Sequence, residues 1–113
     1  MKRYDLGERT LKFARRAIIY VNNLPKNTAN IEIGRQLIKS SGSTGANYIE
    51  AEEALSRKDF VLRIKISRKE SKESRYWLDL SEPLVQQQEE KAALVQEATE
   101  LMKIFGAIIE KSK

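Results

Sequence analysis

The sequence predicts an all-α fold, an up-down-up-down antiparallel four-helix bundle, as a single domain over residues 1–113. Apolar residues recur at helical spacing in four long segments, and no segment alternates apolar and polar residues as a half-buried strand would. Only two prolines and five glycines interrupt the chain. Because the connections between segments are short, successive helices are expected to run antiparallel.

The first helix is expected at about residues 5–23. Asp5 can cap its start, with Glu8 three residues later. Pro25 ends it, because the residue before a proline is disfavoured in helical conformation. Its apolar face comprises Leu6, Thr10, Phe13, Ala14, Ala17, Val21 and Leu24.

The second helix, at about 28–54, contains six consecutive small residues, Ser40 to Gly45. Each mid-helix glycine costs about 1 kcal/mol relative to alanine. Helical periodicity nevertheless continues across this small-residue segment. One face comprises Ile31, Ile38, Gly42, Gly45 and Ile49. An adjacent face comprises Leu37, Ser41, Thr44 and Tyr48. A continuous helix is therefore predicted, with another helix packed closely at Ser41, Gly42 and Gly45. A phosphate-binding loop is disfavoured, because no Gly-Lys-Ser/Thr follows Gly45 and no strand pattern precedes it.

The third helix, at about 56–80, has Ser56 as its predicted cap, with Asp59 as capping partner. It carries two apolar stripes, whereas a surface helix of a monomeric bundle needs one. The first stripe comprises Phe60, Ile64, Ser67, Ser71, Ser74 and Leu78. The second lies on roughly the opposite side and predicts a contact with another subunit, with candidate interface residues Leu62, Ile66, Glu70, Glu73, Trp77 and Leu80.

The fourth helix, at about 87–111, is an ordinary amphipathic bundle helix. Its broad apolar face comprises Leu94, Val95, Ala98, Leu101, Met102, Phe105, Ile108 and Ile109.

Composition excludes several chemistries. The chain has no cysteine and no histidine, so disulfides cannot form and the usual parts of catalytic triads and zinc sites are missing. No apolar run approaches the ~20 residues of a membrane span, and the N-terminus lacks a signal-peptide core. A cytoplasmic protein without a cofactor is expected.

The net charge of +5 is unevenly distributed. Residues 1–24 carry six basic and two acidic side chains, and residues 56–80 carry eight and four. Residues 28–55, by contrast, carry two basic and four acidic side chains. This pattern fits either charge complementarity in packing or binding to an anionic partner such as RNA or DNA. The candidate nucleic-acid-binding residues are Arg9, Lys12, Arg15, Arg16, Lys65, Arg68, Lys69, Lys72 and Arg75.

Two carboxylate pairs are candidates for metal-dependent catalysis. Glu50 and Glu53, and Glu70 and Glu73, each share a helix face at i, i+3 spacing, and together they could hold Mg²⁺. The pattern partly resembles all-α nucleotide pyrophosphatases, but their full ligand set is missing. The alternative is that Glu70 and Glu73 pair with Arg9 or Arg16 to orient helices or subunits.

Several short motifs occur in a fixed order over roughly residues 4 to 80. They are Asp5-Leu-Gly-Glu-Arg-Thr10, Phe13-Ala14, Leu24-Pro25, Gly34-Arg-Gln-Leu37, Ser40 through Asn47-Tyr48-Ile49-Glu50-Ala51, Ser56-Arg-Lys-Asp-Phe60, Lys69-Glu70, Glu73 and Tyr76-Trp77-Leu78. Together they resemble the 23S rRNA-intervening sequence protein family, small four-helix bundles first noticed as reading frames inside intervening sequences of bacterial 23S ribosomal RNA genes.

The resemblance implies a ring-like homopentamer without an established catalytic activity. Related accessory variability proteins of diversity-generating retroelements form basic pentamers that work with a reverse transcriptase and nucleic acid, an analogy at the level of fold. The expected function is therefore a non-enzymatic ring that binds RNA, DNA or a nucleoprotein partner. The alternative is an adaptor ring with a protein partner, and a more remote one is a Mg²⁺-dependent nucleotide pyrophosphatase.

Overall fold

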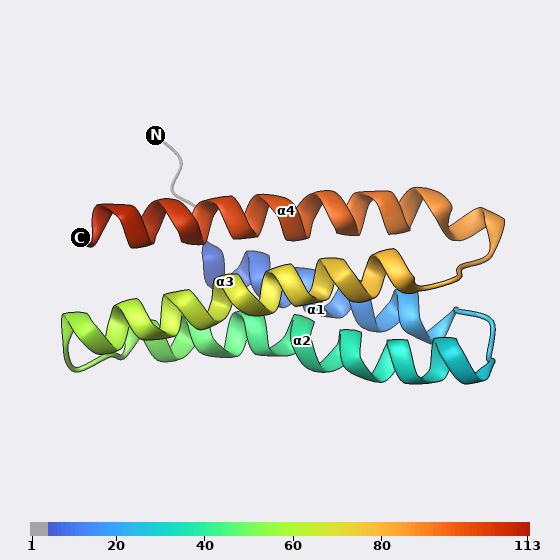
Figure 1. Cartoon of the computed structure of the whole chain (residues 1–113), viewed down its shortest axis with the longest axis horizontal. Helices are drawn as coiled ribbons and strands as arrows, with labels where there is room; N and C mark the ends of the chain where they lie inside the picture. Colours follow the sequence, from blue (N-terminus) through green and yellow to red (C-terminus); the bar gives the residue numbers. More distant parts are fainter. Residues whose placement is uncertain (1–4) are drawn as a thin grey trace.

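The computed structural model describes residues 5–113, which form four α-helices and no strand. The helices are α1 (Leu6–Asn22), α2 (Thr28–Glu52), α3 (Arg57–Leu80) and α4 (Gln88–Lys111), with a short 3₁₀ turn η1 (Val85–Gln87) before α4. Figure 1 shows the helices running along the long axis, with the connections between successive helices at alternating ends. The predicted domain also included residues 1–4, which lie outside the described residues.

Side chains that precede each of the first three helices cap its free N–H groups. Asp5 Oδ1 accepts from the N–H of Glu8 at 3.0 Å, and Ser56 Oγ accepts from the N–H of Asp59 at 3.0 Å. Both predicted caps are confirmed. Asn27 caps α2 in the same way, through the N–H of Asn30 at 2.8 Å. Loss of such a cap typically costs about 1 kcal/mol.

The small-residue segment lies within α2 without a break, as predicted. Its hydroxyls bond back to the helix, since Thr44 Oγ1 donates to the carbonyl of Ser40 at 3.0 Å. The lack of bulk permits close contact with α1. A Cβ on Gly45 would lie 2.8 Å from Thr10 Oγ1, and one on Gly34 would lie 2.6 Å from Val21 Cγ1. Close packing is thus found at Gly45, and at Gly34, which the sequence did not single out.

The prediction of close packing at Gly42 is wrong within the subunit. A Cβ there would meet no atom within 4 Å, and Gly42 is exposed. Ile31, Ile38 and Ile49, on the same side of α2, are exposed as well. The physical reason is that α2 packs against both α1 and α3 through its small and hydroxylated side, which includes the predicted Ser41. The isoleucines are therefore left on the outside.

The first stripe of α3 is buried between α2 and α4, as expected: Ile64, Ser67, Ser71, Ser74 and Leu78 are buried. Phe60, at the start of this stripe, is only partly buried and packs against the core. Contact with α2 is made largely by hydroxyl groups. Ser40 Oγ and Ser74 Oγ are 2.8 Å apart, and Ser67 Oγ donates to the carbonyl of Thr44 at 2.9 Å. Among the described residues no buried side-chain nitrogen or oxygen lacks a partner. Because these small hydroxyl groups are hydrogen-bonded, α2 and α3 can pack closely without the desolvation cost of burying unpaired polar groups.

Larger side chains fill the space beside α4. Phe13, Leu94, Leu101 and Phe105 are essentially fully buried. Tyr20, which the sequence did not place in the core, is also buried, and its hydroxyl lies 2.6 Å from Ser81 Oγ. Burial raises the pKa of the Tyr20 hydroxyl, and the hydrogen bond with Ser81 partly opposes this shift.

Candidate nucleic-acid and subunit interfaces

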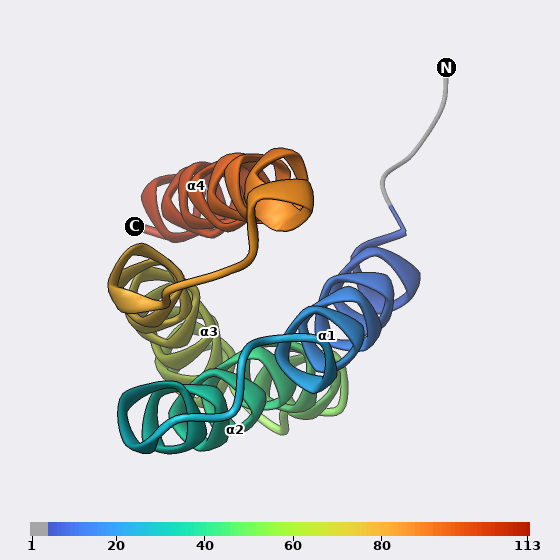
Figure 2. The ribbon, with the colours of Figure 1, turned by 90° about the vertical axis from the view of Figure 1, so that its right-hand side faces the viewer.

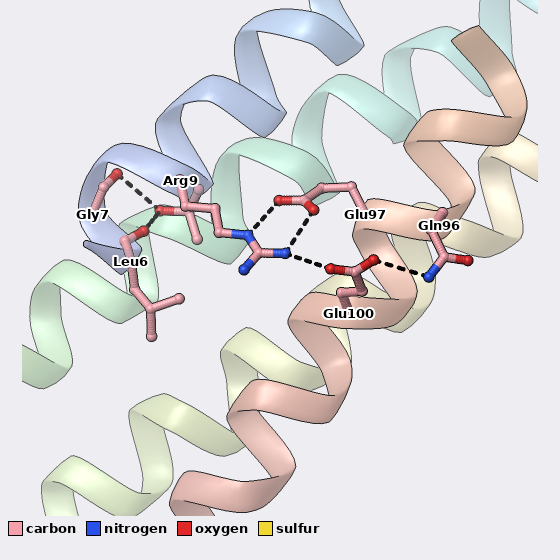
Figure 3. A network of polar contacts seen from close by, with 7 residues as sticks. Leu6, Gly7, Arg9, Gln96, Glu97 and Glu100 are labelled. Atoms are coloured by element: carbon pink, nitrogen blue, oxygen red, sulfur yellow. Dashed lines mark hydrogen bonds and ion pairs between the residues drawn. The ribbon is translucent and has the colours of Figure 1, made fainter. Parts of the chain in front are cut away.

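Two of the four candidate basic residues on α1 are engaged with α4. Arg9 donates two hydrogen bonds to Glu97, from Nε to Oε2 at 2.8 Å and from Nη2 to Oε1 at 2.9 Å. Its Nη2 also donates to Glu100 Oε1 at 2.9 Å (Figure 3). Arg16 grips Glu90 in the same forked manner, at 3.1 and 3.0 Å. Forked arginine–carboxylate pairs have well-defined geometry. They therefore fix α4 relative to α1 where the two helices contact each other only lightly.

The expected pairing of Arg9 or Arg16 with Glu70 or Glu73 is wrong within the subunit. The reason is the arrangement of the bundle: α1 packs against α2 and α4, and lies on the opposite side from α3 (Figure 2). Carboxylates that the sequence did not single out, on α4, take the place of the predicted partners.

The Arg9–Glu97 ion pair is partly shielded from solvent, since its side chains are only 21% and 18% exposed. An ion pair of this kind contributes up to about 1 kcal/mol. The hydrogen bond with Glu90 is the main cause that raises the pKa of Arg16. Hydrogen bonds from Gln96 and then Arg9 lower the pKa of Glu100. The stabilisation from Glu100 is therefore present above its unfolded-state pKa and is lost as pH falls through its lower folded-state pKa.

The remaining α1 cations, Lys12 and Arg15, are exposed and have no ion-pair partner within residues 5–113. Most of the α3 candidates are similar: Lys65, Arg68, Lys69 and Lys72 are exposed and unpaired within the same range. α3 thus contributes the larger group of available positive charges.

Part of the α3 group extends over α4. Arg75 donates to Thr99 Oγ1 at 3.3 Å, and a Cβ on Gly106 would lie 3.9 Å from Arg68 Nη1. Lys103 is exposed on α4, one turn from both Thr99 and Gly106. We call this set the basic edge, and it comprises Lys65, Arg68, Lys72, Arg75 and Lys103. Lys103 was missed from the sequence because it lies in a helix of mildly acidic net charge.

The second stripe of α3 is left largely uncovered by the subunit. Leu62 is 54% exposed, and Leu80 is also exposed. Ile66 and Trp77 are half-buried, and the Trp77 Nε1–H donates to Glu73 Oε2 at 3.2 Å. Burial raises the pKa of Glu70, and the neighbouring charge of Glu73 raises it further. The stripe therefore combines exposed apolar surface with two closely spaced carboxyl groups.

The four carboxylates considered for Mg²⁺ do not form one cluster. Asn47, one turn before Glu50, accepts a hydrogen bond from Arg63 near the start of α3, whereas Ser74, next to Glu73, contacts Ser40. The two pairs are thus opposite different parts of the α2–α3 contact. Across residues 5–113, no three acidic, histidine or cysteine side chains are arranged to hold a metal ion. Within the same residues, none of the helices has the length and apolarity needed to cross a bilayer.

These features define the chain as a small four-helix bundle protein with a basic edge and uncovered apolar helix faces. It belongs to the 23S rRNA-intervening sequence protein family, whose model matches residues 2–107. The chain is also similar to a crystal structure from Bacteroides thetaiotaomicron, described as a protein of unknown function from the S23 ribosomal protein family. The identity is 31%, the match covers 93% of this chain and 95% of that one, and the TM-score is 0.79. No curated protein matches.

Proposed function

We propose that this chain is a cytoplasmic, non-catalytic protein that self-associates, as a homopentameric ring, and binds RNA or DNA through its basic edge. The observation that supports the proposal is that the larger group of cations without an ion-pair partner lies on α3 and the adjacent part of α4. On α1, Arg9 and Arg16 are held by α4 carboxylates and only Lys12 and Arg15 are exposed without an ion pair. On α3 and α4, Lys65, Arg68, Lys72 and Lys103 are all exposed and form no ion pair within residues 5–113. Unpaired cations on one surface are what phosphate binding requires.

The expected binding mode is electrostatic and directed at the phosphate backbone. The basic edge presents lysine and arginine side chains from two packed helices, and no recognition-helix motif accompanies them. Self-association would strengthen this attraction, because five subunits of charge +5 would give a ring of about +25. Binding should therefore have weak sequence preference and a steep dependence on salt.

The test is the affinity of Lys72→Glu for a mixed RNA pool across a salt series. Reversal of a charge in the basic edge should weaken binding by about tenfold at low salt and flatten the salt dependence. Lys12→Glu is the matched control, because it makes the same charge change at an exposed lysine of α1, across the bundle. Equal affinity of wild type and Lys72→Glu, or a larger loss in Lys12→Glu, would contradict assignment of the site to the basic edge.

A second candidate function, an adaptor ring for a protein partner, is supported by the uncovered apolar faces. It predicts no salt-dependent affinity for RNA in the wild-type chain. The same titration therefore distinguishes the two functions.

A further inference from the structure

Tyr76, near the C-terminal end of α3, is the one exposed aromatic side chain among residues 5–113. It is 57% exposed, whereas the other aromatic side chains in this range are buried or half-buried. Its ring packs edge-to-face against Trp77, with the ring centroids 5.1 Å apart and the ring planes at 74°. This contact restrains the ring while more than half of the residue stays open to solvent. A single exposed aromatic residue is ordinary, so its role depends on the side chains around it.

Four lysines form a row on the same face of α3 as Tyr76. Lys72 lies four residues before Tyr76 and Lys69 lies seven before it, so successive turns bring positive charge up to the ring. Lys65 and Lys58 continue the row toward the start of α3 in steps of seven residues. All four are exposed and form no ion pair within residues 5–113. We call these four residues the lysine row.

The row ends in a groove of about 710 Å³ at the start of α3. Three cations line this groove, Arg57, Lys58 and Lys65, against one carboxylate, that of Asp59. Positive charge is therefore in excess from the groove to Tyr76, over about 27 Å of helix at 1.5 Å per residue.

Two carboxylates near Tyr76 do not interrupt this positive track. Glu73 and Asp79 each lie one turn from Tyr76. Glu73 Oε2 accepts a hydrogen bond from Trp77 Nε1 at 3.2 Å, which draws it toward the second stripe and away from the lysine row. Lys91 of α4 donates to the carbonyl of Asp79 at 3.3 Å, which places a further cation beside Asp79.

We infer that this face of α3 binds an unpaired nucleic-acid strand, with a base stacked on Tyr76 and phosphates along the lysine row. The inference rests on the proposed function and names its substrate class, a single strand rather than a duplex. Proteins bind single strands by combining a positively charged track for the backbone with aromatic rings on which bases stack. In a duplex, neighbouring bases cover the base faces, so the ring has no free face to stack on. Stacking accepts any base, which agrees with the weak sequence preference expected of the basic edge.

The test compares the affinity of the full chain at low salt for two strands of equal length. One is an oligothymidylate, and the other is an oligomer of abasic sites, which has the same phosphates and no bases. The wild type should bind the oligothymidylate about tenfold more tightly, the effect of one stacked base. Tyr76→Ala should lose this preference and keep the affinity for the abasic strand, and Tyr76→Phe, which retains a ring, should keep both affinities.

Leu11→Ala is the matched control, because it truncates a half-exposed apolar side chain on α1, across the bundle from α3. It should change neither affinity. Equal affinity of the wild type for the two strands would overturn the inference, whatever the variants do. An equal loss of Tyr76→Ala on both strands would overturn it as well, because the ring would then not act on a base.

The mass of Tyr76→Ala by light scattering should equal that of the wild type. A lower mass would place Tyr76 in a contact between subunits and would also overturn the inference. Failure of the proposed function gives a different result. Lys72→Glu should weaken binding to both strands alike, and a wild type that binds neither strand would contradict the proposed function together with this inference.

Discussion

Gly45→Leu should lower the free energy of unfolding by about 1–3 kcal/mol, the usual cost of forcing extra volume into a packed contact. The Cβ of the new side chain alone would lie 2.8 Å from Thr10 Oγ1 and 3.0 Å from Thr10 Cβ. Thr10 cannot easily move aside, because its hydroxyl donates to the carbonyls of Leu6 at 2.6 Å and Gly7 at 3.1 Å. α1 must therefore shift away from α2.

Thermal unfolding monitored by circular dichroism measures this effect, since 1 kcal/mol corresponds to about 4–8 °C in a domain of about this size. Ala92→Leu, on the exposed side of α4, should leave the melting temperature nearly unchanged. Thr10→Ala combined with Gly45→Leu should recover part of the loss, because it removes the atom nearest to the new side chain. An unchanged melting temperature in Gly45→Leu would mean that α1 and α2 do not approach as closely as described.

Trp77→Asp should dissociate the oligomer, because it places a carboxylate in the C-terminal part of the second α3 stripe, one turn from Glu73. Trp77 also packs partly against the subunit's own core, so this change tests folding and association together. Leu62→Asp separates the two effects. Leu62 is more than half exposed, and its replacement should leave the fold intact while it reduces the mass to that of one subunit.

Light scattering after size exclusion measures the oligomer mass of both variants, and Ile19→Asp is the control. Ile19 is an exposed isoleucine of α1 that lies beside the start of α4, and α1 lies across the bundle from α3. A folded Leu62→Asp chain that keeps the wild-type mass would remove the α3 stripe from the interface.

Capping and periodicity were sufficient to predict the helices of this bundle. Asp5 and Ser56 cap through local hydrogen bonds, which depend only on residues three positions apart. The two stripes of α3 could be separated because one is rich in serine and the other in large apolar residues. On α2, the same reasoning ranked a face with three isoleucines as a packed one. When glycine, serine and threonine make the closest helix contacts, the most hydrophobic face of a helix is not the face that packs in the core.

The candidate sites depended on which helices are neighbours, which periodicity does not determine. Arg9 and Arg16 find their carboxylates on α4, about 75 to 90 residues away in the chain. Lys103 joins the basic edge only because α4 packs beside α3. In both cases the sequence identified the correct residue types on one helix, and the packing of the bundle decided their partners.

The most direct test of the central claim is the light-scattering mass of the wild-type chain with and without a mixed RNA pool, at low and high salt. The account predicts an oligomer near five subunits at both salts, whose mass rises with RNA only at low salt. A monomer would contradict the self-association, and an oligomer whose mass never responds to RNA would contradict nucleic-acid binding by the basic edge.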